Sequence, residues 1–228
     1  MSRPKLLDLF CCQGGAARGY VDAGFDVVGV DIEPQPRYPF EFCRGDALSV
    51  LRGLIRGKSF WFPTSLGELT LGSFSAVHTS PPCQLYSDTH RINRSDFPDL
   101  IGPTRELLER TGLPYVIENV VGAERELRDP VMLCGAMFGR ETYRHRLFET
   151  NWALTAPNHP EHVAKTTKMG RAPVAGEYMH IVGNFSGVDK GREVMGMPWA
   201  SRDGLREAIP PAYTEYIGRQ LLEHMAVS

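Results

Sequence analysis

Short apolar runs alternate with segments of helical character along the first half of the chain. Residues 5–10 form an apolar run, two glycines interrupt the pattern, residues 16–23 have helical composition, and residues 25–30 form a second apolar run that closes at Asp31. This order predicts a strand, a glycine turn, a helix and a parallel strand. In such units the crossover is right-handed and the ligand crevice lies at the carboxyl ends of the strands.

The same alternation continues to about residue 150. Further strands are predicted over residues 74–79, 115–117 and 144–150, and helices over residues 47–56, 99–110 and 211–225. Residues 57–72 carry aromatics, a proline and glycines, which favours a loop. We therefore expect a doubly wound α/β sheet as the fold.

The pattern weakens after residue 150. Glycine, proline, histidine and lysine dominate residues 151–194, and only residues 179–182 are strand-like. The expected organisation is a main domain over residues 1–150, a small loop-rich appendage over residues 151–194, and a closing segment over residues 195–228 that packs back on the main domain.

Composition narrows the class of protein. The 228 residues suit one α/β domain with a small appendage, and no apolar run approaches the length of a membrane span. Asp8 interrupts the N-terminal apolar stretch, which argues against a signal peptide, so a cytoplasmic protein is expected. The five cysteines are odd in number and form no CxxC pair, so we predict neither a disulfide framework nor a structural zinc site.

Charge is distributed unevenly along the chain. The net charge is −2, yet residues 140–171 hold six Lys or Arg against three Glu. A local basic surface of this kind is compatible with a nucleic-acid partner. His159 and His162 form an HxxH pair in the same stretch, but we expect no further ligand nearby and predict no metal site there.

Polar residues follow the first strands in an order that is typical of nucleotide cofactors. Gly14 and Gly15 let the backbone approach a ligand at a helix N-terminus, although glycines at such turns also serve packing. Asp31 stands where a carboxylate accepts hydrogen bonds from ribose hydroxyls. Ile32 is suited to lie against an adenine, and Asp46 to accept from its amine; the alternative is that both carboxylates are only solvated strand ends.

Cys83 differs from an ordinary buried cysteine. It follows Pro81 and Pro82 at the end of an apolar strand, where the chain is stiff and adjoins the expected crevice. A rigid and partly exposed thiol at such a place is suited to nucleophilic catalysis.

Three further polar residues are placed at strand ends. Glu118 and Asn119 directly follow the run of residues 115–117, where Glu118 could exchange a proton with a nitrogen heterocycle. Arg144 and Arg146 are two positions apart in a later predicted strand, so both side chains lie on the same face. One of them can enter the site while the other meets a phosphate. The alternative for Glu118 and Asn119 is that they only cap the end of a strand, and the alternative for the two arginines is that they are charges on an exposed sheet edge.

Read in order, these motifs resemble the DNA cytosine-5 methyltransferase family. The matching segments are Asp8-Leu9-Phe10 with Gly14-Gly15, Pro82-Cys83-Gln84, Glu118-Asn119-Val120, Arg144-x-Arg146 and Ala208-Ile209-Pro210-Pro211. The resemblance covers about residues 4–150 and 195–226. It implies a Rossmann-like class I S-adenosylmethionine-dependent methyltransferase sheet, with a catalytic domain over residues 1–150 and a reduced target-recognition region over residues 151–194.

The resemblance also implies roles for individual residues. Those that would hold S-adenosylmethionine, which leaves as S-adenosylhomocysteine, are Phe10, Gly14, Gly15, Asp31, Ile32, Asp46 and Pro81. Cys83 would attack C6 of a cytosine flipped out of duplex DNA, with Glu118 on the base, Arg146 fixing it and Asn119 ordering the loop. The residues that would contact DNA are Gln84, Arg91, Arg94 and Arg144. We expect neither a metal ion nor a membrane to take part in this activity.

The chain departs from the family pattern at several positions. Cys12 replaces the usual first glycine, Glu207 replaces the usual Asn, and Thr142 stands where a Gln is usual. The appendage is short, so we expect weak sequence selectivity or a partner or oligomer that supplies it. Two other readings stay open: methylation of tRNA cytosine, and a catalytically inactive DNA-binding or regulatory homologue.

Overall fold

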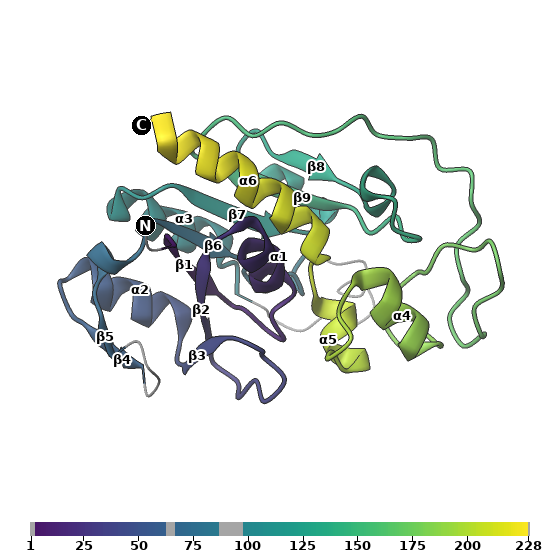
Figure 1. Ribbon diagram of the computed structural model, residues 1–228, viewed down its shortest axis with the longest axis horizontal. Coiled ribbons are helices and arrows are strands. Elements are labelled where there is room, and N and C mark those ends of the chain that lie inside the picture. The colour runs from purple at the N-terminus through teal and green to yellow at the C-terminus, as the bar shows by residue number, and fades with distance from the viewer. Residues whose placement is uncertain (1–2, 63–66, 87–97, 228) are drawn as a thin grey trace.

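The computed structural model describes residues 3–62, 67–86 and 98–227. Its main sheet has seven strands in the order β3-β2-β1-β6-β7-β9-β8 (Figure 1). These strands are β1 (Lys5–Leu9), β2 (Asp26–Asp31), β3 (Glu41–Arg44), β6 (Ala76–Thr79), β7 (Tyr115–Asn119), β8 (Val131–Leu133) and β9 (Arg146–Thr150). The predicted α/β fold with a Rossmann-like sheet is confirmed.

Direction within the sheet explains where the polar strand ends meet. β1 is parallel to β2 and to β6, and β6 is parallel to β7. The chain order reverses between β1 and β6, which is the kind of switch point where open α/β sheets bind ligands. β9 runs antiparallel to β7, so it begins at the edge of the sheet where β7 ends.

Helices cover both faces of the sheet. α2 (Ala47–Ile55) and α3 (Ile101–Thr111) pack on one face, and α1 (Gly15–Ala23) and α6 (Pro211–Val227) pack on the other (Figure 1). α1 and α6 lie against each other, and a side chain at Gly19 would collide with the Pro211 carbonyl oxygen. Each face of the sheet therefore has its own apolar core.

The last third of the chain contains more structure than the sequence predicts. α4 (Val188–Met195) and α5 (Arg202–Glu207) enclose a third, small core. Its buried side chains are Met179, Ile181, Phe185, Val194, Met195, Met197, Ala200, Leu205 and Ala208. The expected boundary after residue 194 falls inside α4, so the appendage and the closing segment share this core.

Several expected elements differ from those observed. Residues 57–72 were expected to form a loop, but β4 (Phe60–Phe62) and β5 (Gly67–Leu69) pair as an antiparallel hairpin, followed by the 3-10 turn η1 (Leu71–Ser73). The predicted strand over residues 179–182 is absent from the described part of the chain, and only an isolated bridge joins Thr166 to Tyr178. The segment lies outside the sheet because its apolar side chains serve the third core instead.

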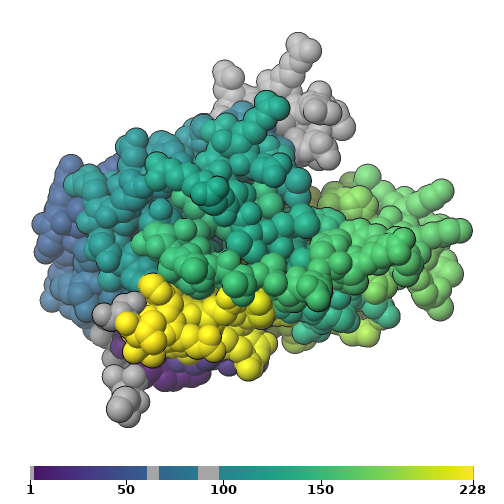
Figure 2. All heavy atoms as spheres, turned by 90° about the horizontal axis from the view of Figure 1, so that it is seen from above, coloured from purple at the N-terminus to yellow at the C-terminus, as the bar shows by residue number. Residues whose placement is uncertain are grey.

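The segment after β9 runs over the molecule toward α4. It passes beside α6, where Thr155 donates two hydrogen bonds to Gln220 Oε1 at 3.1 and 2.9 Å. In the space-filling view these green residues lie next to the yellow α6 and continue into the projecting end (Figure 2). Across residues 3–62, 67–86 and 98–227, no helix combines the length and the apolar character needed to cross a membrane.

Candidate active site

The candidate site lies at the carboxyl edge of the parallel strands. The turn after β1, Asp31 at the end of β2, the segment after β6 and Glu118 near the end of β7 all reach this edge. Arg146 joins them because it is the first residue of the antiparallel β9. Residues that are far apart in the sequence are thus brought together by the direction of their strands.

Glu118 and Arg146 form an ion pair at the centre of the site. Arg146 Nε lies 2.9 Å from Glu118 Oε1, and only 13% and 7% of the two side chains are exposed. Burial raises the pKa of the Glu118 carboxyl, while Arg146, Arg144 and a hydrogen bond with Ser80 act in the opposite direction. The carboxyl therefore takes up a proton more readily than it would in water, as a group that contacts a heterocyclic nitrogen requires.

Cys83 is half-buried next to this pair. Burial and the neighbouring Glu118 carboxylate raise the pKa of its thiol, and Arg146 partly offsets the effect. In this state the thiol is mostly protonated at neutral pH. Its activation therefore requires an added positive charge or a base.

The loop that carries Cys83 is held from β7. Asn119 Nδ2 donates to the Pro81 carbonyl oxygen at 2.9 Å, and Asn119 Oδ1 accepts from the Val120 N–H at 2.9 Å. Tyr86 N donates to the Cys83 carbonyl at 3.0 Å, which closes a turn. Asn119 thus holds the loop that carries Cys83 against the end of β7.

A buried hydrogen-bond chain leads to Glu118 from the core. Tyr20 Oη and His78 Nδ1 lie 3.0 Å apart, and His78 Nε2 lies 3.0 Å from Ser80 Oγ, which in turn bonds Glu118. Burial lowers the pKa of His78 to about 3, so its ring is neutral. Sequence reasoning missed His78 and Ser80; a histidine inside an otherwise apolar strand was the available signal.

The turn after β1 is shaped by Asp31. Its carboxylate accepts hydrogen bonds from the Cys12 N–H at 2.9 Å and from the Glu33 N–H at 3.0 Å. Phe10 and Cys12 have positive φ angles of 58° and 45°, which residues other than glycine rarely adopt. Such backbone strain is common at ligand sites. Ile32, beside Asp31, is 60% exposed.

Two departures from the family pattern contact each other. Cys12 Sγ lies 3.6 Å from Glu207 Oε2, although the two residues are 195 positions apart in the sequence. Burial and the Glu207 carboxylate raise the pKa of the Cys12 thiol to about 12. Cys12 is therefore a neutral donor to Glu207, and the two unusual residues form one joint feature of the rim.

Comparisons with known proteins add information on the fold. No protein-family model and no curated protein matches the sequence. Among solved structures, a candidate DNA modification methyltransferase encoded within an Escherichia coli prophage is similar with a TM-score of 0.59 and 14% identity over 99% of this chain and 100% of that one. An Entamoeba histolytica methyltransferase, EhMeth, has a TM-score of 0.56 and 10% identity over 99% of both chains.

A third structure, the Schizosaccharomyces pombe Dnmt2 methyltransferase, has a TM-score of 0.54 and 13% identity over 98% of this chain and 99% of that one. The chain has the fold of these methyltransferases. The likeness extends over nearly the whole chain, so it includes the region after β9 and not only the sheet.

Gly14 and Gly15 differ in their surroundings. A side chain at Gly15 would meet the Ile209 carbonyl oxygen, so this glycine lets α1 pack against the segment before α6. Gly14 has a φ of 80°, and a Cβ there would lie 3.0 Å from the Tyr38 ring. The alternative reading, in which the glycine serves packing, therefore applies to Gly15.

Arg144 does not have the surroundings of a phosphate ligand. Its Nε, Nη1 and Nη2 donate at 2.8, 2.8 and 2.6 Å to three backbone carbonyl oxygens, those of Ala208, Ile181 and Arg206. These carbonyls belong to the third core and to the segment before α6. The structure therefore corrects the predicted phosphate contact: Arg144 holds the C-terminal region against β9.

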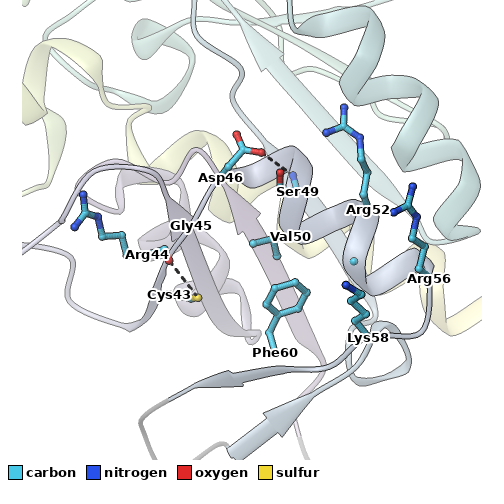
Figure 3. Close-up of a pocket in the computed structure, with 11 residues that line it drawn as sticks. Cys43, Arg44, Gly45, Asp46, Ser49, Val50, Arg52, Arg56, Lys58 and Phe60 are labelled. Atoms are coloured by element: carbon cyan, nitrogen blue, oxygen red, sulfur yellow. Dashed lines mark hydrogen bonds between the residues drawn. The ribbon is translucent and has the colours of Figure 1, made fainter.

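Asp46 has a structural task at the N-terminus of α2. Its Oδ1 accepts from the Ser49 N–H at 2.8 Å, and it borders a cavity of about 500 Å³ between β3, α2 and β4 (Figure 3). Arg52, Arg56 and Lys58 line the far side of that cavity. Neither Cys83 nor Glu118 lines this cavity.

The remaining expected site residues lie on or near the nucleophile loop. Pro81 is buried two residues after the end of β6, and Gln84 is exposed on the turn that follows Cys83. Arg91 and Arg94, expected to contact DNA, lie outside the described residues.

The expectation that the HxxH pair has no further ligand nearby is wrong. Cys134 and His145 lie next to His159 and His162 in the structure.

Proposed function

We propose that this protein transfers a methyl group from S-adenosylmethionine to C5 of cytosine in DNA through a covalent bond between Cys83 and C6. The observation that carries the proposal is the grouping of Cys83 with the Glu118–Arg146 ion pair at one edge of a methyltransferase-like sheet. A nucleophile, a carboxyl group with a raised pKa and a buried guanidinium are the groups that this chemistry needs.

The turn after β1 fits the proposed methyl donor. Phe10 and Cys12 bend the backbone, Asp31 stands at the end of β2, and the exposed Ile32 offers an apolar surface beside it. With Gly14, Asp46 and Pro81, these residues would hold the cofactor. When bound, S-adenosylmethionine supplies an electrophilic methyl group with a positive sulfonium next to it.

The chain's own residues would act on the base in a defined order. Cys83 gives its proton to solvent water and its sulfur bonds to C6, which opens the C5–C6 double bond and leaves the electron pair on the ring; Glu118 contacts N3 and the exocyclic amine and stabilises this charge. C5 then takes up the methyl group. Water or hydroxide removes the C5 proton, the bond between sulfur and C6 breaks, and the Cys83 thiolate is restored. Arg146 holds Glu118 and the base in place throughout.

Trapping with DNA that contains 5-fluorocytosine tests the proposal. Fluorine at C5 cannot leave as a cation, so a competent nucleophile remains bonded to C6 and the complex survives denaturing electrophoresis. The wild type is expected to form this adduct, Cys83→Ser is expected to abolish it, and Cys43→Ser provides a control thiol variant that should retain it. Absence of an adduct with the wild type would favour the inactive homologue instead.

The substrate class is tested separately. Tritium transfer from labelled S-adenosylmethionine to duplex DNA, tRNA and free dCMP, measured side by side, is expected to be fastest with DNA. Faster transfer to tRNA would contradict the DNA assignment and leave the chemistry intact.

We also propose that sequence selectivity is short or weak. The region after β9 has a small core of its own and a long irregular segment, which can supply phosphate contacts more readily than a large base-reading surface. Bisulfite sequencing of treated DNA would contradict this if methylation were confined to a single site of four or more base pairs. A partner or an oligomer would be the source of any longer selectivity.

A further inference from the structure

One thiol and three imidazoles meet beside the start of β9. We call these four residues the CysHis3 cluster: Cys134, His145, His159 and His162. One ligand atom from each lies within 4.8 Å of all the others. Cys134 is buried, His145 is half-buried, and the two loop histidines are exposed. The cluster contains none of the proposed catalytic residues, and the methyl transfer proposed above makes no use of its side chains.

The hairpin of β8 and β9 brings the first two members together. Leu133 pairs with Arg146 in the antiparallel register, so Cys134, one residue beyond, lies opposite His145. His159 and His162 then arrive from the irregular segment that follows β9. The two ends of the HxxH pair therefore meet the hairpin residues, although 25 positions separate Cys134 from His159.

Two of the distances between ligand atoms are close to those around a tetrahedral ion. His145 Nε2 lies 3.2 Å from His159 Nε2, and Cys134 Sγ lies 3.4 Å from His162 Nε2. Zinc bonds of about 2.0–2.3 Å to nitrogen and sulfur place ligands of one tetrahedron roughly 3.3–3.6 Å apart. Neutral imidazole and thiolate are also the donors that zinc prefers in proteins.

Tyr143 orients His162, one of the two loop histidines. The Tyr143 ring stacks on His162 with centroids 3.6 Å apart and planes 17° apart. The Tyr143 hydroxyl donates to the Ala164 carbonyl at 3.0 Å and accepts from the Ala164 N–H at 2.8 Å. Tyr143 thus holds both the His162 ring and the backbone two residues after it. Residues that surround metal ligands commonly fix the orientation of those ligands in this way.

We propose that the CysHis3 cluster binds one structural zinc ion. Four protein ligands complete a tetrahedron and leave no open position, which is the pattern of a structural site and not of a catalytic one. The ion would fasten the irregular segment after β9 to the β8–β9 hairpin. Because His145 directly precedes Arg146, the same ion would fix the start of β9 and with it the arginine that pairs with Glu118.

Metal analysis of the purified full-length chain tests this proposal. The wild type is expected to bind about one zinc ion per chain. His159→Ala and His162→Ala, both at exposed positions, are expected to fold and to weaken zinc binding by at least about tenfold. His180→Ala replaces an exposed histidine outside the cluster and should leave zinc binding unchanged.

Cobalt titration gives a second readout. Co²⁺ bound to the zinc-free protein is expected to show the intense visible absorption of a tetrahedral ion, with a thiolate charge-transfer band that Cys134→Ser removes. Circular dichroism checks that the histidine variants are folded. Wild-type protein that takes up neither Zn²⁺ nor Co²⁺ would overturn the proposal, and so would loop-histidine variants that bind zinc as tightly as the wild type.

Discussion

Arg146 Nε donates across 2.9 Å to Glu118 Oε1, and the two side chains are almost entirely buried. A buried ion pair of this kind depends on both partners, because removing one leaves an uncompensated charge in a poorly solvated place. The pair also joins β7 to β9, so it couples the strand that holds the nucleophile loop to the strand that leads into the appendage.

Glu118→Gln should reduce methyl transfer strongly. Glutamine keeps the size of the side chain but has no carboxylate, so the charge on the attacked base is no longer stabilised, and kcat is expected to fall by about 10²-fold or more. Cofactor binding, measured by calorimetry, should stay close to that of the wild type. Glu124→Gln, at an exposed position, serves as the control; an unchanged rate in Glu118→Gln would remove Glu118 from the mechanism.

The rate should depend on pH through Cys83. Because burial and Glu118 raise the pKa of this thiol, the reactive thiolate is a minor form at neutral pH. We expect kcat/KM to rise as the pH increases through the range of about 7 to 9, approaching tenfold per pH unit while the thiol is mostly protonated. Arg146→Gln removes a charge that lowers this pKa, so its profile should shift to higher pH. If kcat/KM of the wild type did not change over this pH range, the Cys83 thiol would not be mostly protonated at neutral pH and the prediction would be wrong.

Arg144→Met should affect stability more than DNA affinity. The substitution leaves three carbonyl oxygens without their charged donor, at an expected cost of about 2–4 kcal/mol in the free energy of unfolding. Chemical denaturation measures the loss, and Arg219→Met, at an exposed position in α6, is the matched control. If Arg144 contacted phosphate instead, the variant would keep its stability and show a smaller salt dependence of DNA binding.

Asp8→Asn should stabilise the protein at neutral pH. Asp8 is 1% exposed, and burial followed by repulsion from Asp31 raises its pKa well above the ordinary value. The folded protein therefore retains a proton that the unfolded chain releases, so its stability falls as the pH rises from the unfolded pKa to the folded one.

The neutral amide at position 8 removes this loss and is expected to add at least about 1 kcal/mol to the free energy of unfolding at pH 8. Below about pH 4, where Asp8 is protonated in both states, the gain should disappear. Denaturant unfolding at several pH values provides the measurement, with Glu223→Gln, at an exposed position of α6, as the control. An equal gain at pH 3 and pH 8 would rule out this explanation.

The sequence by itself determined five strands of the sheet and the residues at their ends, but neither β3 nor β8 was predicted from it. Apolar runs closed by Asp31, Cys83 and Glu118 could be read without coordinates, because parallel strands deliver whatever follows them to one edge. The local sequence was enough to predict these strand ends, because a strand, its turn and the polar residue after it are neighbours in the chain.

Only the tertiary structure decided which groups those residues meet. Alternation along the predicted strand of residues 144–150 put both arginines on one face, but β9 begins only at Arg146. Arg144, before the strand, bonds three carbonyls of the C-terminal region, while Arg146 meets Glu118. The CysHis3 cluster was equally hidden, since its members come from a hairpin and a distant loop. Contacts across long sequence separations depend on how the elements pack, and neither hydrophobic periodicity nor motif spacing records that packing.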